Sequence, residues 1–165
     1  MEQWKFFSNR EISLILVNNK VTFSNSSIET LLSMGSNELC SFIEYTLKVK
    51  IFNKGDYDLN SGIEKKYFQD LVSSAVLIPI YKKENSYFTI LTKRSSNLNS
   101  HPGQISFPGG RYEKKDISIE QTAIREADEE IGVKKSNIRL LGRLDHYQTR
   151  TGFDIVPIVC FLNSL

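Results

Sequence analysis

The stretch 125–133 reads Arg-Glu-Ala-Asp-Glu-Glu-Ile-Gly-Val, and it does the most to decide the fold of this chain. It is typical of the end of an α-helix, because Gly132 supplies the residue type that most readily adopts the left-handed conformation found there. On such a helix Glu126, Glu129 and Glu130 stand at i, i+3 and i+4, so their side chains share one face. The pattern therefore predicts a helix that carries clustered carboxylates close to its C-terminus.

This acidic face costs the helix free energy. Each like-charge pair at i,i+3 or i,i+4 disfavours the helix by roughly 0.2–0.5 kcal/mol. The helix dipole adds roughly 0.3–1 kcal/mol for each negative group near the C-terminus. A hard divalent cation would offset both terms, because Mg²⁺ prefers carboxylate oxygens together with water and substrate phosphate. The alternative is a solvated, glutamate-rich face, which would be the preferred interpretation if the three acids stood alone.

Residues on both sides of the acids form a longer pattern. Gly110 is followed by five residues, Asp116, eight residues and then the stretch 125–133, and this spacing closely resembles the Nudix box of the Nudix hydrolases. Upstream, residues 91–95 and 103–110 resemble the additional signature of the coenzyme A pyrophosphatase branch of that family. Recognisable Nudix-like sequence begins near residue 74 and covers a little over half of the chain.

The chain departs from the family pattern at named positions. The usual box has Glu in place of Asp116 and one residue fewer before the Arg-Glu pair, and the coenzyme A branch often shares both differences. Asn99 stands where the branch signature usually has an arginine. Asparagine lacks the charged planar fork that binds phosphate, so another nucleoside diphosphate derivative stays open as the substrate.

The resemblance implies roles for the charged residues of the box. It implies that Glu126, Glu129 and Glu130 bind Mg²⁺ or Mn²⁺ and that these acids and Arg125 are the catalytic residues. Arg125 would orient a catalytic glutamate through an ion pair, whereas its ordinary role would be a surface pair with Glu129 at i+4. Which glutamate accepts the proton from water is left open.

Three further residues are expected to contact the substrate. Gly109 and Gly110 would let the backbone approach the helix and the metal site, where a Cβ atom would clash. Arg94 follows a predicted strand, and by resemblance it would face the substrate and bind phosphate.

Other residues in the domain admit two interpretations each. Asp116 either caps the helix that follows it or supports the metal site indirectly. Tyr147 and Phe153 could stack on an adenine ring, although aromatic residues on strands are more often part of the core. His101 and His146 are not spaced as a metal-binding pair.

The resemblance implies an α/β/α sandwich with a mixed sheet, and hydrophobic periodicity is compatible with it. One helix is predicted over 118–131, and strands are predicted over residues 75–81, 87–93, 104–107, 138–148 and 153–162.

Residues 1–70 are rich in Ser, Asn and Lys and are interpreted as an atypical N-terminal α+β accessory segment before a hydrolase domain at 71–165. The predicted elements are a β-hairpin over 12–17 and 20–23 and helices over 27–33 and 36–50. Nudix domains usually continue beyond the last predicted strand with another strand and a helix. Either the N-terminal segment completes the fold, or the chain is a shortened or degenerate member.

Length and composition limit the classes of protein to which this chain can belong. The chain has 165 residues and 40% hydrophobic content, which suits one domain with a hydrophobic core. Its net charge of +2 is too small to create an overall electrostatic field that would attract nucleic acid. No apolar run is long enough to cross a bilayer, and the start does not resemble a secretory signal. Cys40 and Cys160 are expected to be free thiols, as in a cytoplasmic protein.

These observations lead to one main hypothesis and two alternatives. The first is a metal-dependent hydrolase that cleaves coenzyme A or its derivatives into 3′,5′-ADP and 4′-phosphopantetheine. The second keeps the chemistry and acts on another nucleotide-derived diphosphate, such as a dinucleotide. The third is a Nudix-like binding module with weak catalysis. The expected partner is a small molecule rather than nucleic acid or membrane, and family resemblance allows a homodimer.

Overall fold

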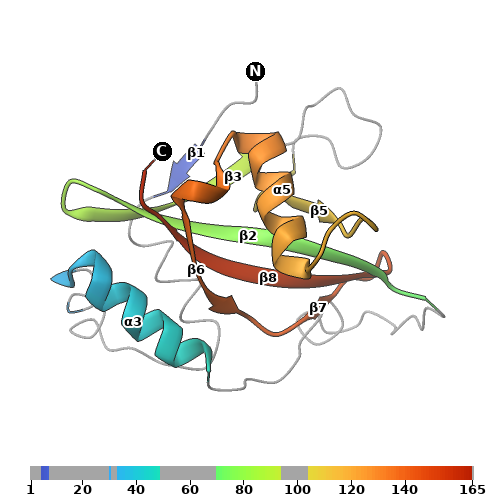
Figure 1. Ribbon diagram of the computed structural model, residues 1–165, viewed down its shortest axis with the longest axis horizontal. Coiled ribbons are helices and arrows are strands. Elements are labelled where there is room, and N and C mark those ends of the chain that lie inside the picture. The colour runs from blue at the N-terminus through green and yellow to red at the C-terminus, as the bar shows by residue number, and fades with distance from the viewer. Residues whose placement is uncertain (1–4, 8–29, 31–32, 49–69, 94–103, 165) are drawn as a thin grey trace.

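The computed structural model describes residues 5–7, 30, 33–48, 70–93 and 104–164 (Figure 1). In chain order its elements are β1 (Lys5–Phe7), α3 (Ser36–Leu47), β2 (Val72–Lys83), β3 (Ser86–Lys93), β4 (Ile105–Ser106), β5 (Gly109–Arg111), α5 (Ile119–Ile131), the 3₁₀ turn η1 (Lys135–Asn137), β6 (Ile138–Arg143), β7 (Tyr147–Gln148) and β8 (Phe153–Leu162).

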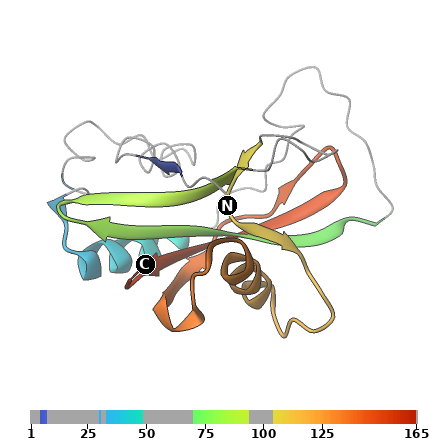
Figure 2. The same ribbon diagram turned by 90° about the horizontal axis from the view of Figure 1, so that it is seen from above.

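The described strands form one mixed sheet. Its main order is β1-β3-β2-β8-β6, and β4, β5 and β7 pair with β3, β2 and β8, respectively. The central strands β2 and β8 run parallel, while the other pairs are antiparallel. Strands β2 and β3 form a long hairpin, visible at one end of the molecule in Figure 2. Parallel strands require a crossover connection, and the segment between β2 and β8 contains helix α5.

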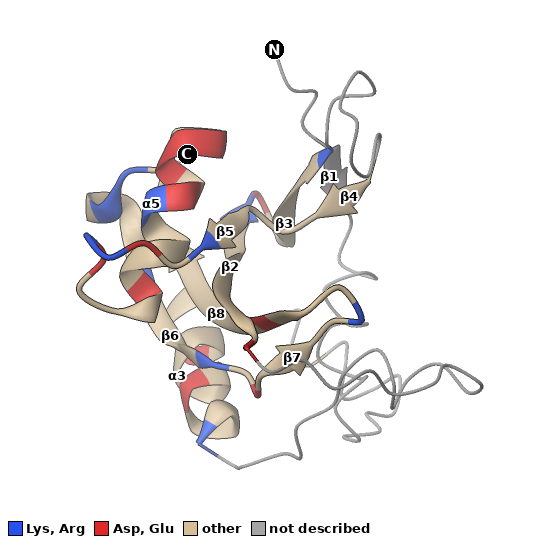
Figure 3. Ribbon diagram, turned by 90° about the vertical axis from the view of Figure 1, so that its right-hand side faces the viewer, with Lys and Arg blue, Asp and Glu red and all other residues tan. Residues whose placement is uncertain are grey.

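The two central strands are apolar on both faces, and their side chains divide between two cores because successive residues point to opposite sides of a strand. The core on the α5 side includes Ala75, Leu77, Val156 and Ile158. The core on the α3 side includes Ile78, Ile80, Val159 and Phe161. The two helices therefore cover opposite faces, as the end-on view in Figure 3 also shows. The predicted α/β/α sandwich is confirmed.

Helix α5 begins and ends where its sequence predicts. The Ser118 hydroxyl accepts a hydrogen bond from the Gln121 backbone N–H at 3.3 Å, so Ser118 is the N-cap. Gly132 has φ 68° and donates its N–H to the Asp128 carbonyl at 2.9 Å. Ala123 and Ala127 are fully buried, and their small size lets the helix lie close to the sheet.

Helix α3 forms the third layer and comes from the N-terminal segment. It buries Leu39, Cys40 and Ile43 against the sheet. An ion pair at 2.9 Å joins Glu44 of this helix to Arg139 of β6. The N-terminal segment thus supplies a layer of the sandwich, while the division of the chain at residue 70 stays a prediction.

Some boundaries differ from the predicted ones. The single strand predicted over 138–148 is wrong, because the chain forms β6 and then the separate short strand β7. A register irregularity between Leu140 and Gly142 precedes the break. The helix predicted over 36–50 is shorter and has Gly35 as its N-cap. The predicted hairpin at 12–23 and most of the helix at 27–33 lie outside the described residues. None of the helices that the structure describes is long and apolar enough to cross a membrane.

We expect Ile43→Ala to lower the free energy of unfolding by about 2–5 kcal/mol, because the substitution leaves a cavity between α3 and the sheet. Ile43 is 2% exposed, whereas Tyr45 on the same helix is 71% exposed and provides a matched control. Urea denaturation should find Tyr45→Ala within about 0.5 kcal/mol of the wild type. Equal stability of the Ile43→Ala variant and the wild type would show that α3 does not pack as described.

Candidate active site

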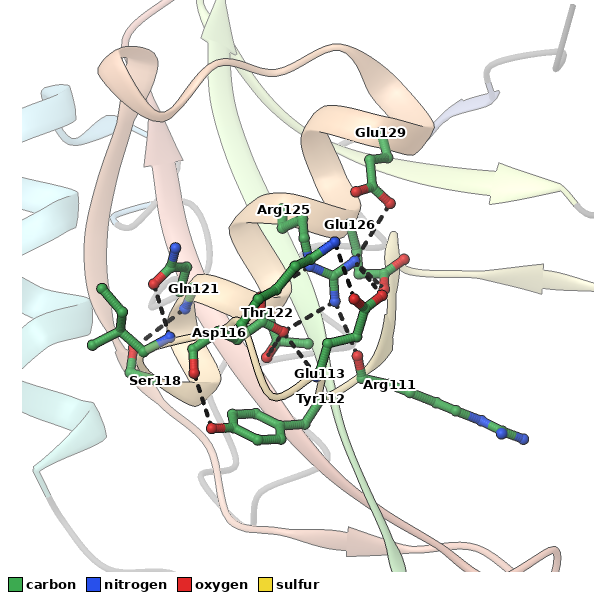
Figure 4. Close-up of polar contacts among 12 residues, drawn as sticks. Arg111, Tyr112, Glu113, Asp116, Ser118, Gln121, Thr122, Arg125, Glu126 and Glu129 are labelled. Atoms are coloured by element: carbon green, nitrogen blue, oxygen red, sulfur yellow. Dashed lines mark hydrogen bonds and ion pairs between the residues drawn. The ribbon is translucent and has the colours of Figure 1, made fainter.

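The candidate site lies where α5 crosses the short strand β5 (Figure 4). Gly110 faces α5, and a Cβ atom at this position would lie 2.5 Å from Glu126 Oε1 and 2.6 Å from Oε2. The Glu126 carboxylate therefore occupies the space that any other side chain at position 110 would need. This contact confirms the close approach of backbone and helix that the sequence predicted at this glycine.

Gly109 has a different structural reason. A Cβ atom there would lie 2.6 Å from Val76 Cα on the paired strand β2, so the limit is set by backbone. The Gly109 N–H donates to Glu130 Oε2 at 3.3 Å. The two glycines thus lie beside two different carboxylates of the same helix.

Arg125 connects these carboxylates to the rest of the site. Its Nη1 lies 2.7 Å from Glu126 Oε1 and 3.4 Å from Glu129 Oε2. The shorter contact is made to the better buried of the two acids, since the Glu129 side chain is 56% exposed. Arg125 therefore forms ion pairs with both glutamates, and the pair with Glu126 is the tighter one.

Asp116 holds Arg125 from the other side. Its carboxylate accepts hydrogen bonds from Arg125 Nε at 3.0 Å and Nη2 at 3.1 Å, from Thr122 Oγ1 at 2.9 Å and from the Glu113 N–H at 3.0 Å. Its side chain is 1% exposed. The capping role considered for Asp116 is wrong, because Ser118 caps α5. Thr122 was not identified from the sequence, and its position inside a helix carries no signal that could have identified it.

The electrostatics of this network favour its charged form. The hydrogen bonds from Arg125 hold the pKa of Asp116 well below its usual range, and these outweigh the desolvation that acts in the opposite direction. The same hydrogen bonds raise the pKa of Arg125, with a further contribution from Glu126. Arg125 Nη2 also donates to the Arg111 carbonyl at 3.0 Å, which ties β5 to the helix.

The donor chemistry of the site fits a hard divalent cation. Glu126 and Glu130 both lie against the Gly109–Gly110 backbone and offer carboxylate oxygens, the ligand type that Mg²⁺ and Mn²⁺ prefer. Glu129 contacts Arg125 and is largely exposed. Within the part of the chain that the structure describes, no three His, Cys, Asp or Glu side chains converge as a metal site. Glu126 and Glu130 are the two glutamates that lie against this backbone and could hold such a cation.

Other residues singled out in the sequence lie elsewhere or outside the described residues. Arg94, Asn99 and His101 belong to the residues that the structure does not describe. His146 Nδ1 lies 2.8 Å from Asp154 Oδ2. Phe153 is half-buried, with the Arg111 guanidinium 5.2 Å from its ring centroid.

Asp116→Asn should destabilise the protein by about 3 kcal/mol near pH 7, since it leaves the largely buried Arg125 without its main partner. The folded-state pKa of Asp116 is lower than the unfolded value of about 3.9, so the stabilisation is present above that value and is lost as pH falls below it. The stability difference between the variant and the wild type should therefore begin to shrink below about pH 4 and should continue to shrink as the pH falls toward the folded-state pKa. The control Asp128→Asn removes a more exposed ion pair and should show no comparable effect. A stability difference that stayed constant down to pH 3 would contradict this role for Asp116.

Gly109→Ala and Gly110→Ala should behave differently. The first substitution meets the backbone of β2 and should cost about 1–3 kcal/mol of stability. The second meets only the end of the Glu126 side chain, which can move, so stability should change by less than about 1 kcal/mol while the carboxylate leaves its position. Chemical denaturation and a crystal structure of Gly110→Ala would test both statements. Equal destabilisation by the two variants would show that Gly110 has only a structural role.

Comparison with known proteins places this site in a family. Residues 72–163 match the NUDIX domain, which is more than half of the chain. The uncharacterized Nudix hydrolase NudL of Yersinia enterocolitica is 42% identical over 86 residues, which cover 52% of this chain and 44% of that protein. The NudL of Photorhabdus laumondii is 43% identical over 89 residues, which cover 54% of this chain and 47% of that protein. The matched part thus spans less than half of the length of these relatives.

Similar solved structures include the Nudix hydrolase RenU from M. smegmatis, with 16% identity, a TM-score of 0.48 and coverage of 59% of this chain and 65% of that chain. A C. elegans Ap4A hydrolase binary complex has 20% identity and a TM-score of 0.47, with coverage of 57% and 68%. The family match over residues 72–163 carries the assignment: this chain belongs to the Nudix family.

Proposed function

We propose that this protein is a Mg²⁺- or Mn²⁺-dependent hydrolase that cleaves the diphosphate linkage of a nucleotide derivative. One observation carries the proposal. The Glu126 carboxylate packs on Gly110 and pairs with Arg125 at 2.7 Å, and Arg125 is itself held by the buried Asp116. Such an anchored carboxylate on a family-matched helix suits the holding of a divalent cation against the negatively charged oxygens of a diphosphate.

The residues divide the work of the reaction. Glu126 and Glu130 would hold the cation, which supplies charge neutralisation on the diphosphate and a lower pKa for bound water. Arg125 keeps the Glu126 carboxylate oriented, and a carboxylate next to the attacking water accepts its proton. The water oxygen forms a new bond to phosphorus, the bond from phosphorus to the bridging oxygen breaks, and two phosphorylated products leave.

Coenzyme A or one of its derivatives is the proposed substrate, with 3′,5′-ADP and 4′-phosphopantetheine as products. The support is the resemblance of residues 91–95 and 103–110 to the coenzyme A branch signature. Asn99, in the position of a usual arginine, favours the alternative of another nucleoside diphosphate derivative.

A binding module with weak catalysis is the competing proposal. It is favoured by the finding that Glu126, Glu129 and Glu130 do not converge as a metal-binding group among the described residues. Family membership does not decide between the two proposals, since one fold can serve both functions.

We also propose a cytoplasmic location. Cys40 and Cys160 are both free and buried, and burial raises the pKa of the Cys160 thiol to about 12. Unpaired thiols of this kind are usual in a reducing compartment. A homodimer remains compatible with the family resemblance, and size-exclusion chromatography with light scattering would determine the oligomeric state.

The activity can be tested with a panel of coenzyme A, NADH, ADP-ribose and a diadenosine polyphosphate, each with Mg²⁺ or Mn²⁺ and with products identified by mass. Release of 3′,5′-ADP from coenzyme A alone would support the first proposal. Turnover of another compound alone would replace the substrate and keep the chemistry. Binding without turnover across the panel would favour the binding module.

Glu126→Gln and Glu130→Gln should each lower kcat at least about 100-fold on whichever compound is cleaved, because each removes a charged oxygen donor from the site. Asp128→Asn is the matched control on the same helix, since Asp128 pairs with Lys134. Its kcat should remain within about twofold of the wild type. Unchanged turnover in both glutamate variants would exclude the proposed mechanism.

A further inference from the structure

Arg111 is a cation beside the site that the proposed mechanism does not use. It follows Gly110 directly in β5, and its side chain is exposed. Three other arginines of the described part of the chain have carboxylate partners: Arg125 pairs with Asp116, Arg139 with Glu44 and Arg143 with Glu120. No carboxylate among the described residues forms an ion pair with Arg111.

The Arg111 side chain nevertheless has a defined support. Its guanidinium lies 5.2 Å from the ring centroid of Phe153, within the range of a cation–π contact. Pairing of Arg111 with Ser74 puts its side chain on the sheet face opposite Gly110, and Phe153 lies on that same face. A guanidinium stacked on an aromatic ring loses little further freedom when it binds an anion, and its planar fork suits phosphate.

The position of β5 places the backbone of Arg111 beside the carboxylates, while its side chain lies on the opposite face of the sheet. Consecutive Cα atoms are about 3.8 Å apart, so Arg111 begins one residue from the glycine that faces Glu126. Strand β5 pairs with β2 on one side, and on its other side the Arg111 carbonyl accepts from Arg125. Figure 4 shows the Arg111 side chain extending away from that network. An elongated diphosphate compound bound at Glu126 and crossing this edge of β5 would meet the guanidinium.

We propose that Arg111, stacked on Phe153, is a substrate-binding residue that recognises a phosphate group of the substrate. This inference rests on the proposed diphosphate hydrolysis and extends it to specificity. The phosphate belongs either to the diphosphate bridge or to a separate monophosphate, such as the 3′-phosphate of coenzyme A. Both sources share the chemistry of a charge-assisted, bidentate contact.

Steady-state kinetics of Arg111→Gln test this role on the best substrate of the panel. We expect KM to rise about tenfold or more while kcat stays within about threefold of the wild type. The reason is that Arg111 would bind the substrate equally well in the ground state and in the transition state, so its loss weakens binding without slowing the chemical step. Arg111→Lys should recover part of the loss. Phe153→Leu should raise KM about two- to fivefold, since it removes only the support of the guanidinium. Arg143→Gln, which removes an exposed arginine paired with Glu120, is the control and should leave KM unchanged.

Calorimetric titration with 3′,5′-ADP and with pyrophosphate gives a second readout that does not depend on turnover. If Arg111 binds phosphate, Arg111→Gln should weaken at least one of these two ligands about tenfold. If Arg111→Gln weakens the binding of 3′,5′-ADP alone, and raises KM for coenzyme A but not for 3′-dephospho-coenzyme A, then Arg111 recognises the 3′-monophosphate. If Arg111→Gln weakens the binding of pyrophosphate and raises KM for both coenzyme A and 3′-dephospho-coenzyme A, then Arg111 recognises the diphosphate bridge.

The outcomes separate this inference from the proposed function. Suppose that the wild type turns over a substrate and that Arg111→Gln has the same KM and the same affinities for 3′,5′-ADP and pyrophosphate. This result would overturn the role of Arg111 and leave the proposed hydrolase activity intact. An increase in KM equal to that of the Arg143→Gln control would overturn it as well. A wild type that neither binds nor cleaves any compound would overturn the proposed function and this inference together.

Discussion

The contact on which the site depends is the ion pair between the Arg125 guanidinium and the buried Asp116 carboxylate. Through one planar group, it joins the loop before α5, the helix itself and the backbone of β5. A buried carboxylate without a partner would be strongly unfavourable, so the loop, strand and helix can adopt few other arrangements. The position of Glu126 is a consequence of this arrangement, since the same guanidinium binds it.

The network also explains how a helix tolerates an unfavourable distribution of charge. Acidic groups near the C-terminus of α5 oppose its dipole and repel one another. Arg125 offsets part of this repulsion, and the Gly109 N–H takes up one oxygen of Glu130. The Glu126 carboxylate lies directly against Gly110 and occupies the space that a side chain at this position would need. The buried core beneath α5 stabilises the helix despite this local cost.

That core shows why both helices are needed. Strands β2 and β8 are apolar on both faces, so a single helical layer would leave one face of the central pair in water. Helix α5 covers one face with Ala123 and Ala127, and α3 covers the other with Leu39 and Ile43. The N-terminal segment therefore contributes to the same sandwich that presents the site.

The sequence by itself determined the features that depend on local patterns. Periodicity and the terminating Gly132 predicted a helix over 118–131 and a strand over 153–162, and the structure has α5 at Ile119–Ile131 and β8 at Phe153–Leu162, because such signals act on their own neighbourhood. The glycines at 109 and 110 and the charged face of the helix were likewise recognisable as one candidate site. Only the tertiary structure decided which side chains meet across the fold. The sequence left two roles open for Asp116, a helix cap or an indirect support of the metal site, and it did not predict the contacts of Asp116 with Arg125 and Thr122. It also did not predict which face of the sheet α3 covers. The physical reason is that such contacts depend on how strands pair and helices pack. The spacing of residues along the chain does not determine which distant residues are brought together by this packing.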